Sequence, residues 1–441
     1  MNGIIMWLIL RHKVVYYFES KAKTRKGVVI NMIVTRAEQH YIRRSNKFFN
    51  LIDDLCFESK NIYNYANYLI RQKYIENGEY IKRFDMQVIM KDTECYKALG
   101  SNVGQVTIQM LDIAWKSFFS ATKDWTKNPN KYLGRPKIPK YLDKNGRYVV
   151  GLTNNKFKIF DGYIRFSWKK LYCMNNTFQT RIPKTAKLIQ CRFVPKGSCY
   201  VMEIVYQIEV PDTAEQSEKI ASIDLGVDNF ITMVNNIGIQ PIAVKGGIIK
   251  SINQYYNKKK AKLQSELMKV NKQHWSKRLQ KLTDDRYEKI KYQMHCISKR
   301  VVDYCVMYGI DTLIVGRNKG WKQKNEGMQN FTYIPYEMFE NMLQYKCENN
   351  GIKCILTNES YTSGTSFLDN EQPCKENYDK SRRVHRGLFV GNNGTKINAD
   401  VNGAYQIMKK VIPDAFAKGI EGVGLHPTVI QMSNREWVTT Q

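Results

Sequence analysis

The stretch IASIDLGVDNFITMVNN (Ile220–Asn236) decides the fold of the second half of the chain. An apolar run ends at Asp224, Gly226 permits a tight turn, and a second apolar run follows, which predicts two paired strands. An acid at the end of a strand lies at the carboxyl edge of a sheet, where open α/β folds place their ligands. Asp224 is therefore a candidate site residue. The alternative is an ordinary Asp before a turn glycine.

The segments after this stretch alternate between helices and strands. A helical insertion rich in Lys and Arg is expected at about 249–308, in two runs separated at about 281–283. Short apolar runs at 309–316 and 352–360 predict strands, the first of them covered on both faces. Such alternation indicates an α/β sheet domain, which we place at 216–441.

The first half of the chain follows different patterns. Residues 46–128 have apolar positions at helical spacing and are expected to form a helical domain. From Tyr200 to Val210 every even position is apolar, which predicts a strand with one buried face. With the strand-like segments upstream, a small barrel or sandwich is expected at 129–215, and residues 1–45 are assigned to the same β-domain.

The charge of the chain indicates a polyanionic partner. The formal net charge is +29, from 69 Lys and Arg against 40 Asp and Glu. Phosphates neutralised by such side chains release counterions, and this release drives binding to nucleic acid. Aromatic residues, which can stack on bases, make up 12% of the chain. The alternative is a basic protein that merely repels its neighbours.

Several other classes of site lack their motifs. The sequence contains no H-E-x-x-H metal pair, no G-x-S-x-G elbow and no phosphate-binding G-x-x-x-x-G-K-[ST] loop. Its ten cysteines form no C-x-x-C pair, so we interpret them as reduced thiols that mostly fill the core.

The N-terminal segment is open to two interpretations, a buried strand or a non-native extension. GIIMWLIL (Gly3–Leu10) is apolar but too short to span a bilayer, and a buried strand is the alternative. Met32 begins MIVTRAEQH, so we hypothesise that translation starts there and that residues 1–31 are a non-native extension. Intact residues 1–31 in the native protein, detected by mass spectrometry, would disprove this.

Two further acids could join Asp224 in a site. Glu359 also follows an apolar strand, and Asp400 lies in the first turn of a predicted helix, where capping is its alternative role. Charges of like sign about 4 Å apart repel by about 4 kcal/mol at an effective dielectric near 20. Mg²⁺ makes such a cluster tolerable, because it binds hard oxygen ligands. Two such ions would activate water for phosphodiester hydrolysis.

Motifs in a fixed order give the chain a family resemblance. Together they resemble the TnpB (OrfB) proteins of insertion sequences, from about Met32 onward. The motifs are NIYNYANYLIRQKYI (61–75), GRPKIPKYLDKNGR (134–147), IDLGVDNFITM (223–233), HCISKRVVDYC (295–305), LIVGRNKGWKQ (313–323), NESYTSGTSFLDNE (358–371), RGLF (386–389) and INADVNGAY (397–405). Members of this family are RNA-guided DNA nucleases related to compact type V CRISPR effectors. The resemblance implies a RuvC-like, RNase H-type nuclease domain and an N-terminal lobe of a wedge-like β-barrel and a helical recognition domain.

The resemblance assigns roles to the acids by position. Asp224 matches the first RuvC acid and Asp400 the last. Many relatives place the second acid, a Glu, where Gly316 stands here. We therefore hypothesise that Glu359 is the second metal-binding carboxylate, with Asp369 and Glu371 as fallback candidates.

A second departure concerns zinc. Many relatives have two C-x-x-C pairs between the second and third acids, whereas this chain has only Cys374 there, with Thr365 and Ser366 where a pair would begin. We expect no four-ligand zinc site. The segment at about 361–396 is predicted to be a degenerate zinc-finger-like loop that keeps its shape through packing.

Nucleic-acid contacts are expected on both lobes. The candidates for these contacts are Tyr63, Tyr65, Arg71, Lys73, Arg135, Lys137, Arg300, Trp321, Lys322 and Arg386. The tyrosines could instead be partly buried in the core. The basic helices, and Arg382, Arg383 and Arg386, could instead form a solvated surface. Trp115 and Phe118 are expected in the core.

The predicted function is RNA-guided, Mg²⁺-dependent cleavage of double-stranded DNA next to a short motif, in support of transposon maintenance. A noncoding guide RNA is the expected partner, no membrane is involved, and a monomer in the prokaryotic cytosol or nucleoid is favoured. One alternative is a type V CRISPR effector, which a neighbouring CRISPR array would reveal. Another is a nuclease-dead DNA-binding regulator, which Gly316 keeps open. A DNA-joining transposase is disfavoured, because no His-hydrophobe-His motif is found.

Overall fold

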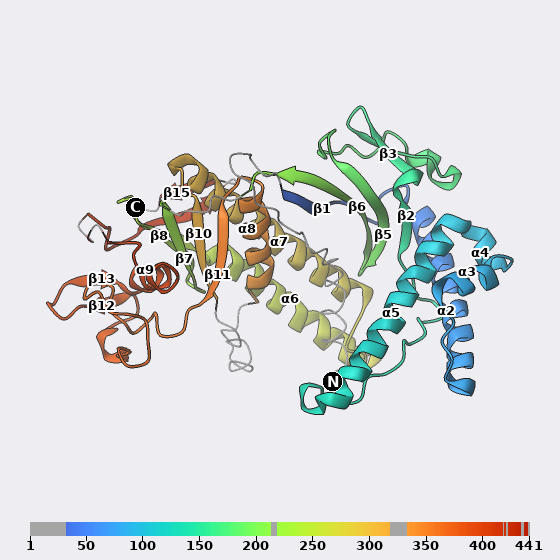
Figure 1. The fold of residues 1–441 in the computed structure, drawn as a ribbon, viewed down its shortest axis with the longest axis horizontal. Helices are drawn as coiled ribbons and strands as arrows, with labels where there is room; N and C mark the ends of the chain where they lie inside the picture. Colours follow the sequence, from blue (N-terminus) through green and yellow to red (C-terminus); the bar gives the residue numbers. More distant parts are fainter. Residues whose placement is uncertain are drawn as a thin grey trace, which may run out of the picture.

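The computed structural model has two lobes joined by long helices (Figure 1). It describes residues 32–212, 218–317, 333–417, 419, 422–433 and 436–439. The predicted extension 1–31 and the candidates Trp321 and Lys322 lie outside these residues.

An antiparallel sheet forms part of the N-terminal lobe. Its strand order is β1 (Met32–Ile42), β6 (Cys199–Val210), β5 (Lys187–Lys196) and β2 (Val150–Thr153), and a separate hairpin pairs β3 (Phe157–Phe160) with β4 (Tyr163–Phe166). β1 pairs only with β6, and β2 only with β5, so the described strands leave two open sheet edges. The expected barrel is therefore not closed by these strands. The alternation of apolar residues predicted the buried face of β6 but carried no information on closure.

Four helices pack beside this sheet. They are α2 (Phe49–Asn77), α3 (Arg83–Met90), α4 (Glu94–Leu99) and α5 (Ser101–Lys127), and they fill the range predicted to be helical. Trp115 of α5 is fully buried, and its Nε1 donates to Asn67 Oδ1 of α2 at 3.0 Å. Its ring packs against Phe118, as expected for two core residues.

The C-terminal lobe is built on a seven-stranded mixed sheet. Its order is β11 (Lys353–Asn358), β10 (Thr312–Arg317), β7 (Ile220–Leu225), β8 (Asn229–Asn235), β9 (Ile242–Lys245), β14 (Thr428–Ser433) and β15 (Glu436–Thr439). β7, β10 and β11 are parallel, so their carboxyl ends meet at one edge. The expected α/β sheet is thus present. β14 and β15 were not predicted, because such short segments show little periodicity.

The two faces of this sheet carry different helices. Ala221 and Ile223 belong to a core with α7 (Lys277–Tyr308) and α8 (Tyr336–Glu348), whereas Ile220 packs with α9 (Ala399–Val411). Side chains alternate along a strand, so Asp224 shares the face of α9 with Ile220. α9 therefore runs beside the end of β7 (Figure 1).

The helical insertion divides a few residues earlier than predicted. α6 (Gly247–Asn271) ends at Lys272, which has a left-handed backbone with φ 52°. α7 begins after Ser276, whose hydroxyl accepts from the Leu279 backbone N–H at 3.2 Å. This cap, rather than a change in the apolar pattern, sets the boundary.

α7 and α8 connect the two lobes through polar contacts. Arg36 of β1 pairs with Glu348 of α8 at 2.8 Å, and Lys291 Nζ of α7 donates to Gln39 Oε1 at 2.7 Å. Among the described residues no helix is long and apolar enough to cross a membrane.

Candidate active site

Asp224 lies in β7 against the N-terminal part of α9. The position matches the predicted strand end, and the side chain is partly buried. A Cβ added at Gly403 of α9 would lie 3.1 Å from Asp224 Oδ2. Gly403 therefore lets the helix approach the carboxylate closely.

Glu359 follows β11 directly, two strands away from Asp224. Its backbone N–H donates to the carbonyl of Arg317 at 3.4 Å, which keeps this residue beside the end of β10. A Cβ added at Gly316 would lie 3.1 Å from Glu359 Oε2 and 2.5 Å from Ile407 Cδ1. The carboxylate of Glu359 thus lies in the space that a side chain at Gly316 would occupy.

Asp400 reaches the same region from the first turn of α9. Asn398 caps this helix, since its Oδ1 accepts from the backbone N–H groups of Asp400 and Val401 at 3.0 and 3.1 Å. The capping role is therefore filled without the Asp400 carboxylate. Instead, Asp400 Oδ2 accepts from Asn229 Nδ2 at 2.9 Å, and Oδ1 from Arg383 Nη2 at 3.2 Å.

The three carboxylates interact through their charges. The pKa of Asp224 is raised to about 8, mainly by burial and also by the negative charges of Glu359 and Asp400. The positive charge of Arg383 opposes this shift. The structure thus brings the three predicted acids, from three separate segments, into one electrostatic neighbourhood. Such a shifted group beside like charges is typical of functional sites.

Two residues that the sequence did not single out support this region. Asn229 holds Asp400, and Tyr336 donates its hydroxyl to the carbonyl of Gly226 at 2.9 Å, in the turn after Asp224. Burial, followed by the charges of Glu359 and Asp224, raises the pKa of Tyr336. Asn229 belongs to the quoted DLGVDN motif and could have been noticed there. Tyr336 had no such signal.

The donor chemistry of the site fits a divalent cation. Carboxylate oxygens are hard ligands of the kind that Mg²⁺ prefers, and one cation, the Arg383 guanidinium, already lies among them. In the described part of the chain, no three His, Cys, Asp or Glu side chains are arranged to hold a metal ion. The two carboxylate oxygens of Asp400 accept from Asn229 and from Arg383.

The fallback acids have structural contacts of their own. Arg382 lies 2.7 Å from Glu371 and 3.7 Å from Asp369, and Glu371 also accepts from the Ser366 backbone N–H at 2.8 Å. These pairs hold the 361–396 loop together and engage both acids within it. Arg382 is correspondingly committed to the loop.

The base of this loop packs on α9. The ring of Phe367 stacks on Tyr405 with centroids 4.3 Å apart, and Asn402 accepts from the Phe367 N–H and donates to the Thr365 carbonyl. A short hairpin of β12 (Leu388–Val390) and β13 (Lys396–Asn398) completes it. The loop has a defined shape that rests on packing and ion pairs.

The predicted aromatic contacts on α2 divide into buried and exposed residues. Tyr63 is 6% exposed and packs on Tyr148 with centroids 4.7 Å apart, so its ring is not available for stacking on a base. The helix turns Tyr63 toward the core.

Tyr65 and Tyr68 are 44% and 46% exposed, with nearly parallel rings whose centroids lie 6.5 Å apart. Next to them, Arg71 lies 4.6 Å from the ring centroid of Tyr141.

The other cationic candidates are scattered. Lys73 pairs with Glu79 at 2.8 Å, Arg135 lies over Trp125, and Lys137 is exposed in the segment after α5. Arg300 is half-buried in α7. The side chain of Arg386 is 83% exposed and pairs with Asp228 near the carboxylates. The structure therefore does not gather these residues into one site.

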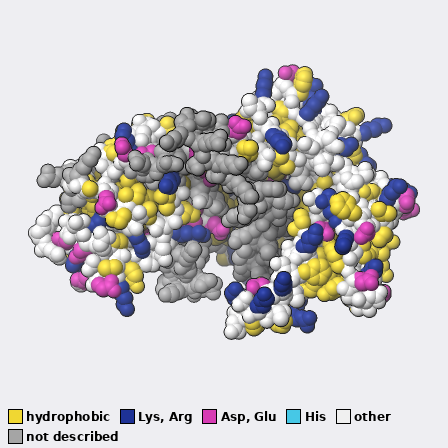
Figure 2. Space-filling model, viewed as in Figure 1, with side chains coloured by type: hydrophobic (Ala, Val, Ile, Leu, Met, Phe, Trp, Pro, Cys, Tyr) yellow, Lys and Arg dark blue, Asp and Glu magenta, His cyan; other side chains and the backbone are white. Residues whose placement is uncertain are grey.

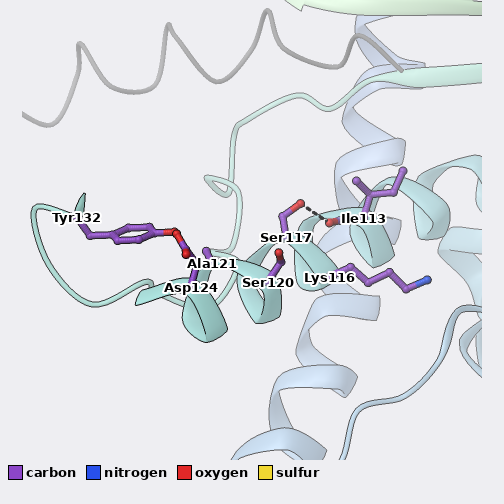
Figure 3. A pocket seen from close by; sticks show the side chains of 7 residues that line it. All are labelled: Ile113, Lys116, Ser117, Ser120, Ala121, Asp124 and Tyr132. Atoms are coloured by element: carbon purple, nitrogen blue, oxygen red, sulfur yellow. Dashed lines mark hydrogen bonds between the residues drawn. The ribbon is translucent and has the colours of Figure 1, made fainter. Parts of the chain in front are cut away.

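A pocket of about 650 Å³ lies on α5, in the other lobe from the carboxylates (Figure 3). Its charged groups are already satisfied: Lys116 pairs with Asp112 at 2.8 Å, and Asp124 accepts from the Tyr132 hydroxyl at 2.8 Å. This pocket offers no chemistry comparable to that of the acids.

Comparisons with known proteins agree with the motifs. The OrfB_IS605 family model, described as a probable transposase, matches residues 203–322, and a model of the Cas12f1-like TNB domain matches 336–407. A TnpB-like protein, ORF457 of Acidianus two-tailed virus, is 22% identical over 437 residues, covering 90% of this chain and 88% of that protein. The chain is similar to the TnpB (OrfB) proteins over most of its length. The predicted resemblance is thereby confirmed.

The fold has a relative among solved structures. The protein of a Cas12f1–sgRNA–target DNA complex superimposes with a TM-score of 0.55 at 13% identity, covering 82% of each chain. This likeness shows that the two chains share a two-lobed fold.

Proposed function

We propose that the chain is an RNA-guided, Mg²⁺-dependent DNA endonuclease of the TnpB type, with Asp224, Glu359 and Asp400 as its three acids. The observation that carries the proposal is the convergence of the three acids: Glu359 Oε2 lies 3.1 Å from a Cβ added at Gly316, Asp224 Oδ2 lies 3.1 Å from one added at Gly403 of α9, and Asp400 lies in the first turn of α9. Burial, with the charges of Glu359 and Asp400, raises the pKa of Asp224. A chain with a net charge of +29 gathers three acids at a sheet edge. A cluster of that kind costs stability unless a cation is held there.

Glu359 supplies the acid that is missing at Gly316. A glycine at 316 leaves room for the Glu359 carboxylate, and β10 and β11 are parallel neighbours with Gly316 opposite Thr357. The second acid of this site would then come from the next strand of the same sheet edge. This arrangement favours an active nuclease over the nuclease-dead regulator that Gly316 alone would suggest.

The residues of the chain would divide the work of hydrolysis. Divalent cations, when bound, would polarise the phosphodiester and lower the pKa of the attacking water. Asp224, Glu359 and Asp400 would provide the oxygen ligands. Asn229 orients Asp400 through its 2.9 Å hydrogen bond, and Tyr336 fixes the turn after Asp224. Partial burial keeps the local dielectric low, which strengthens each of these interactions.

The partners that we propose are a noncoding guide RNA and a double-stranded DNA target. The residues at 46–128 and 129–215, with 32–45, would form a nucleic-acid-binding lobe, and 216–441 the nuclease domain. Lys and Arg side chains are scattered over the visible face of the N-terminal lobe, among hydrophobic and uncharged surface (Figure 2). Exposed Tyr65 and Tyr68 offer flat surfaces on which unpaired bases can stack, beside the half-buried Arg71.

One experiment tests this function directly. The protein is co-purified with RNA transcribed from its flanking locus, the RNA is sequenced, and a plasmid matched to the guide is incubated with and without Mg²⁺. We expect bound RNA, and cleavage that requires both Mg²⁺ and Asp224. Absence of bound RNA would refute RNA guidance, and guided binding without cleavage would favour the regulator.

A further inference from the structure

Arg383 places a positive charge among the carboxylates of the candidate site. Its Nη2 lies 3.2 Å from Asp400 Oδ1, and its charge also lowers the pKa of Asp224. One guanidinium thus acts on two of the three acids. It does so from the 361–396 loop, which carries neither of them.

The anchors of this loop do not depend on Arg383. The base is fixed to α9 through Phe367 and Asn402, and Arg382 pairs with Glu371 inside the loop. The Arg383 side chain is 34% exposed and pairs with Asp400. It can therefore leave the carboxylate while the loop keeps its structure.

Arg383 and a metal ion would compete for the same oxygen. Asp400 Oδ2 already accepts from Asn229, so Oδ1, which faces Arg383, is the oxygen that changes partner most readily. Binding of one cation at this atom disfavours the other, since both gain from the same negative charge. By linkage, the factor by which the Arg383 contact weakens metal binding equals the factor by which bound metal weakens the Arg383 contact, so removal of the contact strengthens metal binding.

We propose that Arg383 is the internal counterion of Asp400 in the metal-free protein, and that a divalent cation displaces it. Metal binding would then free the segment around Arg383 from the acids. This inference rests on the proposed function, because it requires that the three acids bind metal. Arg383 is a positioning residue in this scheme.

Mn²⁺ binding to the full-length protein tests the proposal. The probe is Mn²⁺ alone, followed by the loss of its free electron paramagnetic resonance signal. Arg383→Gln is expected to bind Mn²⁺ about two- to fivefold more tightly, the range that a half-exposed ion pair accounts for. Arg383→Lys keeps the charge and should remain near the wild-type affinity.

Arg386→Gln is the matched control. It removes the same charge from the same loop, but its partner is Asp228 rather than one of the three acids. Its effect on Mn²⁺ affinity should be smaller than that of Arg383→Gln. Unchanged or weaker binding in Arg383→Gln, or an equal gain in both variants, would overturn the proposal.

Two further measurements separate the inference from the function on which it rests. If Asp224→Asn leaves Mn²⁺ binding unchanged, the metal site itself fails, and the counterion role fails with it. If Mn²⁺ binding requires Asp224 but Arg383→Gln does not strengthen it, only the counterion role fails. In the wild type, hydrogen exchange in 379–388 should rise on addition of Mn²⁺, and no rise would contradict displacement.

Discussion

In the C-terminal lobe Asp224, Glu359 and Asp400 lie close enough for their charges to interact, whereas in the N-terminal lobe Tyr65 and Tyr68 lie exposed along α2. Asp224 and Glu359 lie at strand ends and Asp400 at the start of a helix, and Gly403 and Gly316 leave room beside the carboxylates of Asp224 and Glu359. The tyrosines are held only by the helix that carries them. Like charges need a rigid frame to stay together, while a stacking surface needs only exposure. Changes in the first region should therefore alter chemistry or stability, and changes in the second should alter affinity alone.

The largest effect is expected at Asp224. Asp224→Asn should lower cleavage of a guided plasmid by more than about 100-fold, because replacing even the outer partners of metal ligands commonly costs 10–100-fold. RNA binding, measured by filter retention, should stay within experimental error of the wild type. A loss of RNA binding in this variant would mean that the two regions are not separable.

Glu359→Gln should lower cleavage by roughly 100-fold on the same grounds. Glu337→Gln, which alters an exposed acid of α8, is the control and should cleave like the wild type. Full activity of Glu359→Gln would refute the assignment of the second acid.

Gly316→Ala tests the position of the Glu359 carboxylate without removing an acid. The added Cβ would lie 2.5 Å from Ile407 Cδ1 and 3.1 Å from Glu359 Oε2. Such overpacking should cost about 1–3 kcal/mol of unfolding free energy, measured by urea titration, and lower cleavage as well. Unchanged stability and activity would show that Glu359 does not depend on this space.

Stability should depend on pH through Asp224. The pKa of this group is raised from 3.8 to about 8, so the folded protein keeps a proton that the unfolded chain releases. The stabilisation is fully present below about pH 4 and is lost as the pH rises through 8, at up to about 1.4 kcal/mol per pH unit. Urea unfolding in EDTA at pH 5 and pH 8 measures this loss.

Asp224→Asn should remove most of that pH dependence, since an amide does not titrate. Asp285→Asn, which removes an exposed carboxylate of α7, controls for the loss of one negative charge. An equal slope in the wild type and Asp224→Asn would contradict the shift.

The sequence predicted the proximity of the three acids better than it predicted their surroundings. Asp224, Glu359 and Asp400 were each visible as acids at an element boundary, and the structure places them together. The pairing of Arg383 with Asp400 could not be read from the sequence, because the two residues are 17 positions apart and the path of the chain between them includes the β12–β13 hairpin. Likewise, spacing did not reveal that Tyr63 faces the core while Tyr65 faces solvent. Local patterns identify element ends, but loop paths and barrel closure depend on long-range packing.

The smallest effect is expected on α2. Tyr68→Ala should weaken binding of single-stranded RNA by about 1–3 kcal/mol if one base stacks there. Tyr68→Phe keeps the ring and should bind like the wild type, and Tyr63→Phe, at a buried position, should do the same. Arg71→Gln should reduce the salt dependence of binding by about one phosphate contact.

Cleavage at saturating RNA should be unchanged in Tyr68→Ala. Reduced cleavage there, with RNA affinity intact, would place this surface in the chemistry of the protein and break the division between the lobes.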